Sequence, residues 1–273
     1  MSEQVITPPR GWSLPNVREL WEYRDLLYFL VRRDVSIRYR QTLIGTVWAI
    51  LQPLLLAAVF SVFLGHYADV PSGAGVPYPV FAVTGMVMWL YFSQAMQFAS
   101  DSTVASRELI GKVWFPRMII PIAAVLPPAI DFVPAFGVAF VVMLIYGVVP
   151  PVQILLIPLL AVLTLTVALG IGLWLSALNV RYRDIRLAVP FLVLVGLFVT
   201  PIVYPFDVVP EAAKAFYALN PMVGVLETYR WMLFPDADWP GTLLLVPLAT
   251  SVLLLISGAV YFNRAERDFA DVI

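Results

Sequence analysis

Residues 132–180, FVPAFGVAFVVMLIYGVVPPVQILLIPLLAVLTLTVALGIGLWLSALNV, contain no Asp, Glu, Lys or Arg. A helix needs about 20 mostly apolar residues to cross the hydrocarbon core of a bilayer, so this run is long enough for two crossings. The pair Pro150-Pro151, which follows Tyr146-Gly147, is a natural break between them. The stretch therefore predicts two membrane-spanning helices joined by a short turn.

The rest of the chain repeats this pattern. Four further runs lack charged residues, at 41–68, 70–100, 187–206 and 239–263, and the long run extends back to Met118 with only Asp131 interrupting it. These runs predict an all-α polytopic membrane protein with six transmembrane helices. The expected spans are about 45–66, 79–100, 118–147, 152–178, 187–205 and 242–262.

The composition supports a membrane protein and excludes several other classes. Of the 273 residues, 61% are hydrophobic and 13% are charged, whereas soluble proteins have about 45–50% apolar and about 25% charged residues. The absence of cysteine excludes disulfide scaffolds and Cys-ligated metals, and a single histidine, His66, argues against a metal cluster or a catalytic triad. The net charge of −1 provides no attraction to nucleic acid. No G-x-x-x-x-G-K-[ST] loop is present to hold ATP phosphates.

The positive residues predict the orientation. Fifteen of the 17 Lys and Arg residues fall on one side of the expected spans, together with both termini. By the positive-inside rule this side is cytoplasmic. The first 40 residues have no signal-peptide hydrophobic region, so no cleavage is expected. The chain is accordingly divided into a cytoplasmic segment 1–44 with an amphipathic interface helix, a transmembrane domain 45–262, and a cytoplasmic tail 263–273.

Two segments outside the spans have unusual patterns. In residues 16–40, apolar side chains recur near helical spacing with arginines between them, which predicts a helix in the cytoplasmic headgroup plane. The external stretch 206–241 is apolar, but its core 215–226 is too short to cross and is broken at Asn220-Pro221. Two short external helices that re-enter the outer leaflet fit this pattern. A helical cap outside the membrane is the alternative.

Asp131 is the ionisable residue that lies deep within an expected span. A charge there is costly, so Asp131 is expected to face the protein interior. It is either a proton or substrate contact, or a packing hydrogen bond to a Ser, Thr or Trp of a neighbouring span. We favour the packing role, because a proton path usually needs more than one such group.

The cytoplasmic segment 105–117, ASRELIGKVWFPR, is expected to form a short amphipathic helix that ends before Pro116. Such a helix suits either the membrane surface or the docking of a cytoplasmic protein. RYRDIR at 181–186 is interpreted as a positively charged anchor that contacts anionic lipid.

Aromatic residues make up 14% of the chain. Most aromatic residues of membrane proteins are expected in interfacial belts, although rings on a pore face would also stack on sugars.

Six motifs occur in one order along nearly the whole chain. They are RDVSIRYRQTLIGTVWAILQPLL (33–55), LIGKVWFPRMIIP (109–121), LNVRYRDI (178–185), TPIVYP (200–205), NPMVGVLETYR (220–230) and ERDFADVI (266–273). In this order and topology the chain resembles the membrane subunit of ABC-2 exporters for lipid-linked polysaccharides, the O-antigen, capsule and teichoic-acid permeases. Ile44 is a conservative departure, because leucine is expected before the glycine.

The resemblance implies a half-transporter of the bacterial cytoplasmic (inner) membrane rather than an enzyme. Two copies of the chain would form a homodimer of twelve spans in membrane lipid and bind two copies of a separate ABC ATPase subunit. ATP and Mg²⁺ would be held by that subunit, so no cofactor is expected in this chain. The substrate would be a lipid-linked polysaccharide.

The resemblance also implies roles for individual residues. The first and fifth spans would line the conduit, which assigns pore-lining aromatics to Trp48, Phe191, Phe198 and Tyr204. The gate would be at Ile44 and Gly45. The ATPase-coupling contacts would be Arg107, Glu108 and Lys112. We add the hypothesis that Arg38 and Arg40 contact the lipid phosphate, because guanidinium groups suit phosphate geometry.

Two other functions are compatible with parts of the pattern. An ABC-2 exporter of a small lipid or a drug would share the topology. A membrane-embedded glycan polymerase or glycosyltransferase would need clustered catalytic acids. The candidate acids on the outer side lack such a motif; they are Asp207, Glu211, Glu227, Asp236 and Asp238.

Overall fold

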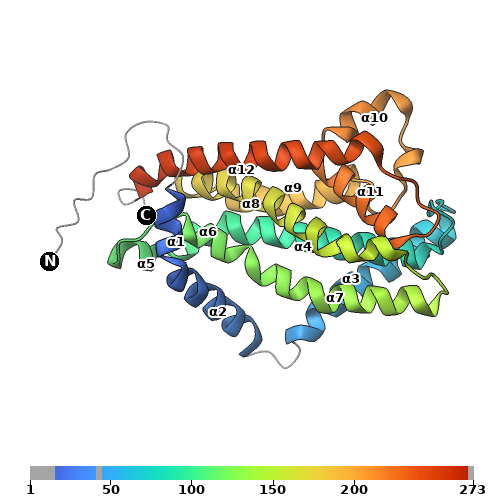
Figure 1. Ribbon diagram of the computed structural model, residues 1–273, viewed down its shortest axis with the longest axis horizontal. Helices are drawn as coiled ribbons and strands as arrows, with labels where there is room; N and C mark the ends of the chain where they lie inside the picture. Colours follow the sequence, from blue (N-terminus) through green and yellow to red (C-terminus); the bar gives the residue numbers. More distant parts are fainter. Residues whose placement is uncertain (1–15, 41–44, 270–273) are drawn as a thin grey trace.

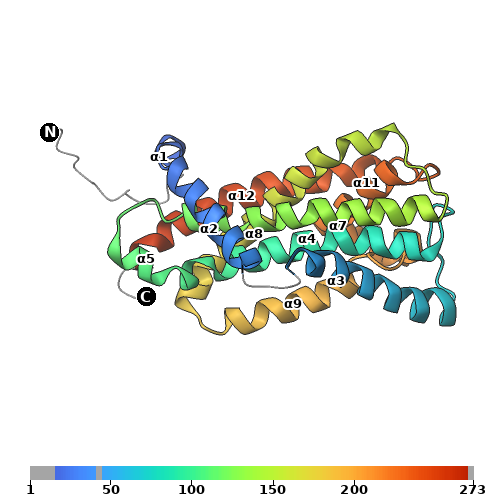
Figure 2. The same cartoon turned by 90° about the horizontal axis from the view of Figure 1, so that it is seen from below.

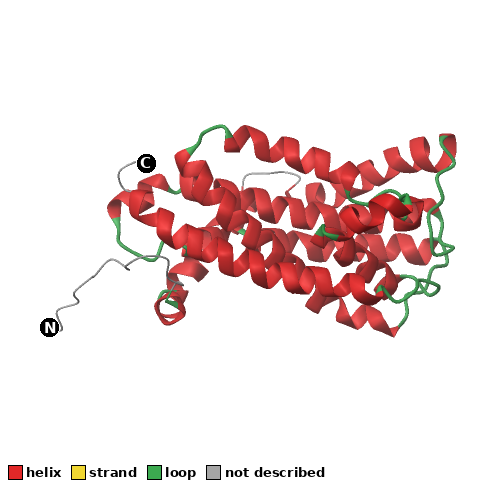
Figure 3. Ribbon diagram, turned by 90° about the horizontal axis from the view of Figure 1, so that it is seen from above, coloured by secondary structure: helices red, strands yellow, loops and turns green. Residues whose placement is uncertain are grey.

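The computed structural model describes residues 16–40 and 45–269, and in these ranges every regular element is helical (Figures 1 and 3). The α-helices are α1 (Val17–Glu22), α2 (Arg24–Arg40), α3 (Gly45–Phe60), α4 (Tyr78–Ala105), α5 (Arg107–Lys112), α6 (Ile119–Ala124), α7 (Leu126–Ile145), α8 (Ile157–Arg181), α9 (Ile185–Val199), α10 (Glu211–Ala218), α11 (Pro221–Leu233) and α12 (Leu245–Ala265). Short π or 3₁₀ segments are η1 (Ser61–Tyr67), η2 (Val152–Leu156), η3 (Phe206–Val208), η4 (Gly241–Leu244) and η5 (Glu266–Asp268).

Five helical stretches of the described chain are long and apolar enough to cross a membrane, which confirms the all-α membrane class. They are Val47–Tyr67, Tyr78–Lys112, Ile119–Ile145, Val152–Arg181 and Gly241–Ala265.

The expected span 187–205 differs from these five. Its helix, α9, is apolar but has only 15 residues, a length of about 22 Å compared with the ~30 Å hydrocarbon core. The helix stops at Thr200-Pro201, where proline disfavours helix at the preceding residue. The count of six spans therefore stays a prediction.

Helix α4 is the centre of the bundle. It packs against α3, α7, α8 and α9, and most of its side chains are buried (Figure 2). Small residues permit these close contacts: a Cβ on Gly172 of α8 would collide with the Ala99 side chain of α4. Interhelical hydrogen bonds add to the packing, with Thr103 and Ser176 hydroxyls 2.6 Å apart and Asn179 donating to the Ser100 carbonyl at 3.1 Å. Close packing and such bonds are what hold helices together in lipid.

Helices α8 and α12 form a second close pair. A Cβ on Gly258 would lie 2.6 Å from the Gly170 carbonyl oxygen, so the backbones touch where both residues are glycine. One side chain adds a ring contact and a hydrogen bond beside them. The Trp174 ring stacks on Tyr261 at 4.2 Å, and its indole N–H donates to the Ser257 hydroxyl at 3.1 Å. Glycine at this crossing is a packing requirement.

The two short helices after α9 have different environments. α10 lies on the outside of the bundle, whereas α11 packs beside α8 and α12 with most of its side chains buried (Figure 1). Asn220 caps α11 by accepting the Met222 N–H at 3.0 Å, and Pro221 is its first residue. Gly224 lets α11 approach the Leu243 carbonyl. Of the two expected helices, α11 is the one enclosed by other helices.

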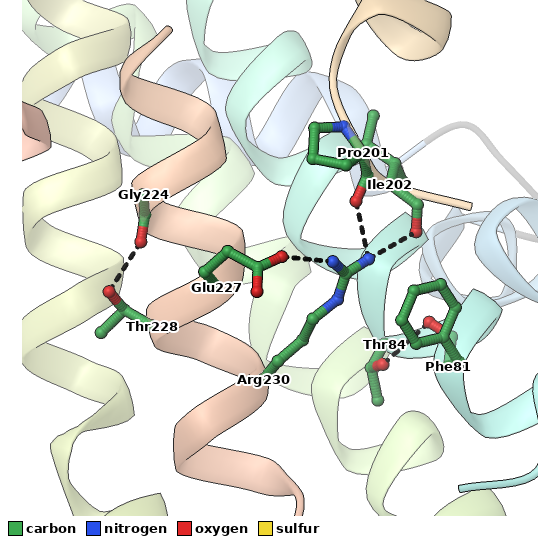
Figure 4. A network of polar contacts seen from close by, with 8 residues as sticks. All are labelled: Phe81, Thr84, Pro201, Ile202, Gly224, Glu227, Thr228 and Arg230. Carbon is green, nitrogen blue, oxygen red and sulfur yellow. Dashed lines mark hydrogen bonds and ion pairs between the residues drawn. The ribbon is translucent and has the colours of Figure 1, made fainter. Parts of the chain in front are cut away.

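A buried arginine of α11 holds the irregular segment that follows α9 (Figure 4). Arg230 is 7% exposed, and its guanidinium donates to Glu227 at 2.6 Å and to the Pro201 and Ile202 carbonyls at 2.6 and 3.2 Å. The guanidinium also lies over the Phe81 ring of α4, at 4.1 Å. Because these carbonyls come after the last turn of α9, Arg230 supplies the donors that a helix would otherwise provide.

We expect Arg230→Met to destabilise the protein, because it leaves the Glu227 carboxylate and two buried carbonyls without their donor. Removing one partner of a buried ion pair costs about 3–5 kcal/mol. The measurement is the melting temperature in detergent, followed by size-exclusion chromatography. The matched control is Lys214→Met, which removes a cation paired at 2.7 Å with the exposed Glu211 of α10. Equal melting temperatures for the two variants would contradict the role given to Arg230.

We expect Gly258→Ala to lower the melting temperature, because the new methyl group meets the Gly170 carbonyl. Overpacking of this kind costs about 1–3 kcal/mol. Gly137→Ala in α7 is the control, since a Cβ there has nothing within 4 Å. It should leave the melting temperature unchanged or raise it through helix propensity. Loss of stability in the Gly137 variant alone would show that the α8–α12 contact is not limiting.

Candidate functional site

One end of the bundle gathers segments that are far apart in the sequence: α1, α5 and the last turn of α12 (Figure 1). We call it the basic end, because Arg and Lys side chains of α2, α5 and α9 line a hollow there. The hollow, of about 670 Å³, lies between α2, α4, α5 and α9. It is lined by Arg33, Asp101, Val104, Ala105, Ser106, Arg107, Glu108, Leu109, Lys112 and Arg186. Of the charged residues that line the hollow, four are cationic and two are acidic, so a binding partner meets more positive than negative charge.

The three predicted coupling residues lie on α5 at the mouth of this hollow. The helix begins after Ser106 and ends at Lys112, where Val113 turns extended, so the expectation of a short helix that ends before Pro116 is confirmed. Glu108 and Lys112 are 3.9 Å apart with both side chains mostly exposed. Exposed pairs contribute little stability. These side chains are thus available to a partner rather than needed to hold α5.

The loop after α5 is fastened to the end of α12. The backbone N–H of Arg117 donates to the Glu266 carboxylate at 3.2 Å, and its guanidinium donates to the Glu266 carbonyl at 2.5 Å. Burial raises the pKa of the Glu266 carboxyl, and the Arg117 N–H opposes that shift. Phe269 lies against both Arg117 and Phe262. Sequence reasoning missed this attachment, although both residues occur in the motifs quoted above.

Asp131 is paired with Arg38 of α2. The Arg38 Nη1 lies 2.7 Å from the Asp131 Oδ2, and the Asp131 side chain is 9% exposed. The ion pair with Arg38 was not among the partners expected from the sequence. The sequence predicted a helix in the headgroup plane over residues 16–40, and its place relative to the membrane stays a prediction. In the structure α2 slants across the bundle, and its last turns reach α3 and α7 (Figures 1 and 2).

The ion pair continues into a line of amides. Arg38 Nη2 donates to the side-chain oxygen Oε1 of Gln94 at 3.2 Å. The side-chain nitrogen Nε2 of Gln94 in turn donates to Oε1 of Gln52 on α3 at 3.4 Å. The Arg38 guanidinium also lies over the Phe98 ring at 4.8 Å. Four helices, α2, α3, α4 and α7, are thus connected through polar side chains. Neither glutamine was singled out from the sequence, because neutral side chains do not interrupt a charge-free run.

The remaining predicted residues around the gate are described only in part. Ile44 lies outside the described residues, and Gly45 is the first residue of α3. Arg40 is the last residue of α2, and its side chain is also outside the description. Their assigned roles stay predictions.

Three of the four predicted pore aromatics are exposed on α3 and α9. α3 and α9 follow the same side of the bundle, along the lower edge of Figure 2, where Trp48, Phe191 and Phe198 are 57%, 64% and 55% exposed. The Phe198 ring contacts Phe60, at a centroid distance of 6.5 Å, which joins the two helices. We call this surface the α3/α9 face. Tyr204 differs: it is half-buried, and its hydroxyl donates to the Phe198 carbonyl at 2.7 Å.

The described residues place no three His, Asp or Glu side chains together as metal ligands would be. What they do offer is a cation-lined hollow, an apolar aromatic face and a buried ion pair. None of these is a constellation for covalent chemistry, and all three suit binding and movement.

Comparison with known proteins covers nearly the whole chain. It is 31% identical over 264 residues to the O-antigen export system permease protein RfbA of Myxococcus xanthus, with 94% of this chain and 98% of that protein covered. It is 27% identical to the protein of the same name from Klebsiella pneumoniae (91% and 95% covered). It is 24% identical to the polysialic acid transport protein KpsM of Escherichia coli (87% and 92%). The profile of the ABC-2 type transporter family matches residues 25–234, and the chain belongs to this family.

Proposed function

We propose that the chain is the transmembrane subunit of an ABC exporter that moves a lipid-linked polysaccharide of the O-antigen, capsule or teichoic-acid type across the cytoplasmic membrane. The observation that carries the proposal is the near full-length similarity to permeases named for O-antigen export. The α3/α9 face and the basic end add physical support, because export needs a conduit surface and a site where energy enters.

The conduit in this proposal is formed by two copies of the chain facing each other. Within one copy the stretch Val47–Tyr67, which includes most of α3, is largely exposed: only 11% of its most apolar segment is buried. Such a surface faces either lipid or a second copy. Exposed rings at Trp48, Phe191 and Phe198 suit the second case, because aromatic faces stack on sugar rings. Tyr204 would shape the outer end of the conduit, and Ile44 and Gly45 its cytoplasmic gate.

A separate ATPase subunit, also in two copies, would bind ATP and Mg²⁺ and dock at the basic end. The cation-rich hollow beside α5 supports this docking site, and Arg107, Glu108 and Lys112 would be its coupling contacts. ATP binding would then shift the population of closed and open conduits. The attachment of Arg117 to Glu266 supports a further step, in which displacement of the loop after α5 also moves the end of α12.

The lipid head of the substrate would meet arginines of α2. Arg38 and Arg40 stand at the end of α2 that leads to α3, and guanidinium groups recognise phosphate well. Both termini would be cytoplasmic in this orientation. The division into a cytoplasmic segment 1–44, a six-span domain 45–262 and a tail 263–273 belongs to the same proposal.

We expect Phe191→Ala with Phe198→Ala to lower polysaccharide export about fivefold or more, equivalent to about 1 kcal/mol or more of lost ring contact. The measurement is polysaccharide at the cell surface in a strain that lacks the native gene. The control is Leu155→Ala with Leu159→Ala, which removes exposed apolar side chains outside the α3/α9 face. Equal export by both double variants would argue against a sugar-binding conduit and favour a small-lipid exporter.

We expect the chain to co-purify with its ATPase as a two-plus-two complex, and Glu108→Ala to lower ATP turnover of that complex severalfold in lipid. The reason is that Glu108 is exposed beside the proposed docking hollow. Glu211→Ala, an exposed acid on α10, should leave turnover unchanged. A chain that purifies alone, without an ATPase, would overturn the half-transporter and favour a membrane-embedded enzyme.

A further inference from the structure

The Arg38–Asp131 pair joins the slanting helix α2 to the membrane-spanning helix α7. A carboxylate that is 9% exposed needs a partner, because an unpaired buried charge is strongly destabilising. Arg38 provides it at 2.7 Å with one nitrogen and reaches Gln94 with the other. The Arg38–Asp131 ion pair therefore helps to position the last turns of α2.

Arg38 also lines a separate cavity. This space of about 430 Å³ lies between α2, α4 and α6, with apolar walls that include Leu30, Ile37, Phe98 and Pro127. It is an amphipathic cavity, because its lining also includes the charged residues Arg33, Asp34, Arg38 and Asp101. The apolar walls suit a lipid chain, and the arginine suits its charged head.

The other charged groups that line this cavity have partners of their own. Arg33 is bound to Asp34 at 2.8 Å, and Asp101 accepts the Asn179 amide at 3.0 Å. An anionic head in the cavity would compete directly with Asp131 for the N–H groups of Arg38. The competition depends on charge, because a ligand must attract Arg38 more strongly than the nearby Asp131 carboxylate does.

We propose that Asp131 is a competing carboxylate that holds Arg38 until a lipid diphosphate takes its place. The inference rests on the proposed function, in which Arg38 contacts the substrate phosphate. Taking Arg38 away from the buried Asp131 carboxylate is costly. A diphosphate carries more than one negative charge and offsets that cost, whereas a phospholipid phosphodiester carries one and does not. Asp131 thereby selects the diphosphate head of the substrate over the bulk lipid that surrounds the protein.

Displacement has a structural consequence. Once Arg38 leaves Asp131, this ion pair no longer joins α2 to α7. The same helix contributes Arg33 to the hollow at the basic end. Substrate in the cavity would thus change α2 at the ATPase-docking hollow.

The first test measures affinity. The complex with its ATPase is placed in phosphatidylcholine nanodiscs, and binding of geranylgeranyl diphosphate is titrated. Asp131→Asn should bind about tenfold more tightly than the unmodified complex, since the competitor has lost its charge, and should also bind phosphatidylglycerol. Arg38→Gln should bind about tenfold more weakly. Glu211→Gln on α10 is the control and should bind as the unmodified complex does.

The outcomes distinguish the competition by Asp131 from the phosphate contact of Arg38 on which it rests. Weaker binding in Arg38→Gln together with unchanged binding in Asp131→Asn would keep the phosphate contact and overturn the competition. Unchanged binding in Arg38→Gln would overturn both. Tight binding of phosphatidylglycerol to the unmodified complex would overturn the selectivity for diphosphate.

The second test needs no change at the ion pair. The chain has no cysteine, so Phe29→Cys on α2 and Val133→Cys on α7, both exposed positions, accept one pair of spin labels in each copy; the labelled chain is assembled with an excess of unlabelled, cysteine-free chain, so that most labelled complexes carry one pair. The distance between the labels should change when saturating geranylgeranyl diphosphate is added, and geranylgeraniol, which lacks the diphosphate, should leave it unchanged. An unchanged distance with bound diphosphate would overturn the release of α2.

Discussion

A bilayer core has no water to satisfy backbone N–H and C=O groups, and the described structure is organised around that constraint. Long helices satisfy it by themselves, but the chain after α9 does not. There the Pro201 and Ile202 carbonyls accept Arg230, and the Val203 carbonyl accepts the Tyr78 hydroxyl at 2.5 Å. The burial of α11 follows from this need, because only an enclosed helix brings a charged donor to carbonyls at that place.

The same constraint governs the charged side chains. In the part of the chain that the structure describes, the buried charged residues are Asp131 and Arg230, and each has an ionic partner. The two pairs differ in reach. Glu227 and Arg230 belong to one helix, α11, whereas Arg38 belongs to α2 and Asp131 to α7. The Arg38–Asp131 distance therefore depends on the relative position of two helices, and this is why the proposed substrate contact and the proposed movement meet there.

Sequence patterns predicted the helical class and six apolar spans, and five helical stretches of the described chain are long and apolar enough to cross a membrane. Such patterns predict spans because transfer of charge into lipid is so costly that charge-free runs mark the spans directly. They did not predict which side chains meet. Arg38 and Asp131 were each noted, but their pairing depends on the slant of α2, which no periodicity encodes. Gln52 and Gln94 were missed because neutral amides leave hydropathy almost unchanged. The sequence placed Phe191 and Phe198 on an apolar helix, and only tertiary packing shows that both rings lie on an open face.

The enclosure of α4 has a consequence for how the protein is made. Helices that cover α4, including α7 and α8, come later in the chain. Until they are synthesised, the polar groups of α4 that they later meet, such as Thr103, Ser100 and Asp101, lack their final partners. A helix whose hydrogen-bond partners are synthesised after it stays incompletely packed in the meantime, because the chain is made and folded from its N-terminal side. Biogenesis of this protein is therefore a problem of delayed assembly, with the centre inserted early and enclosed late.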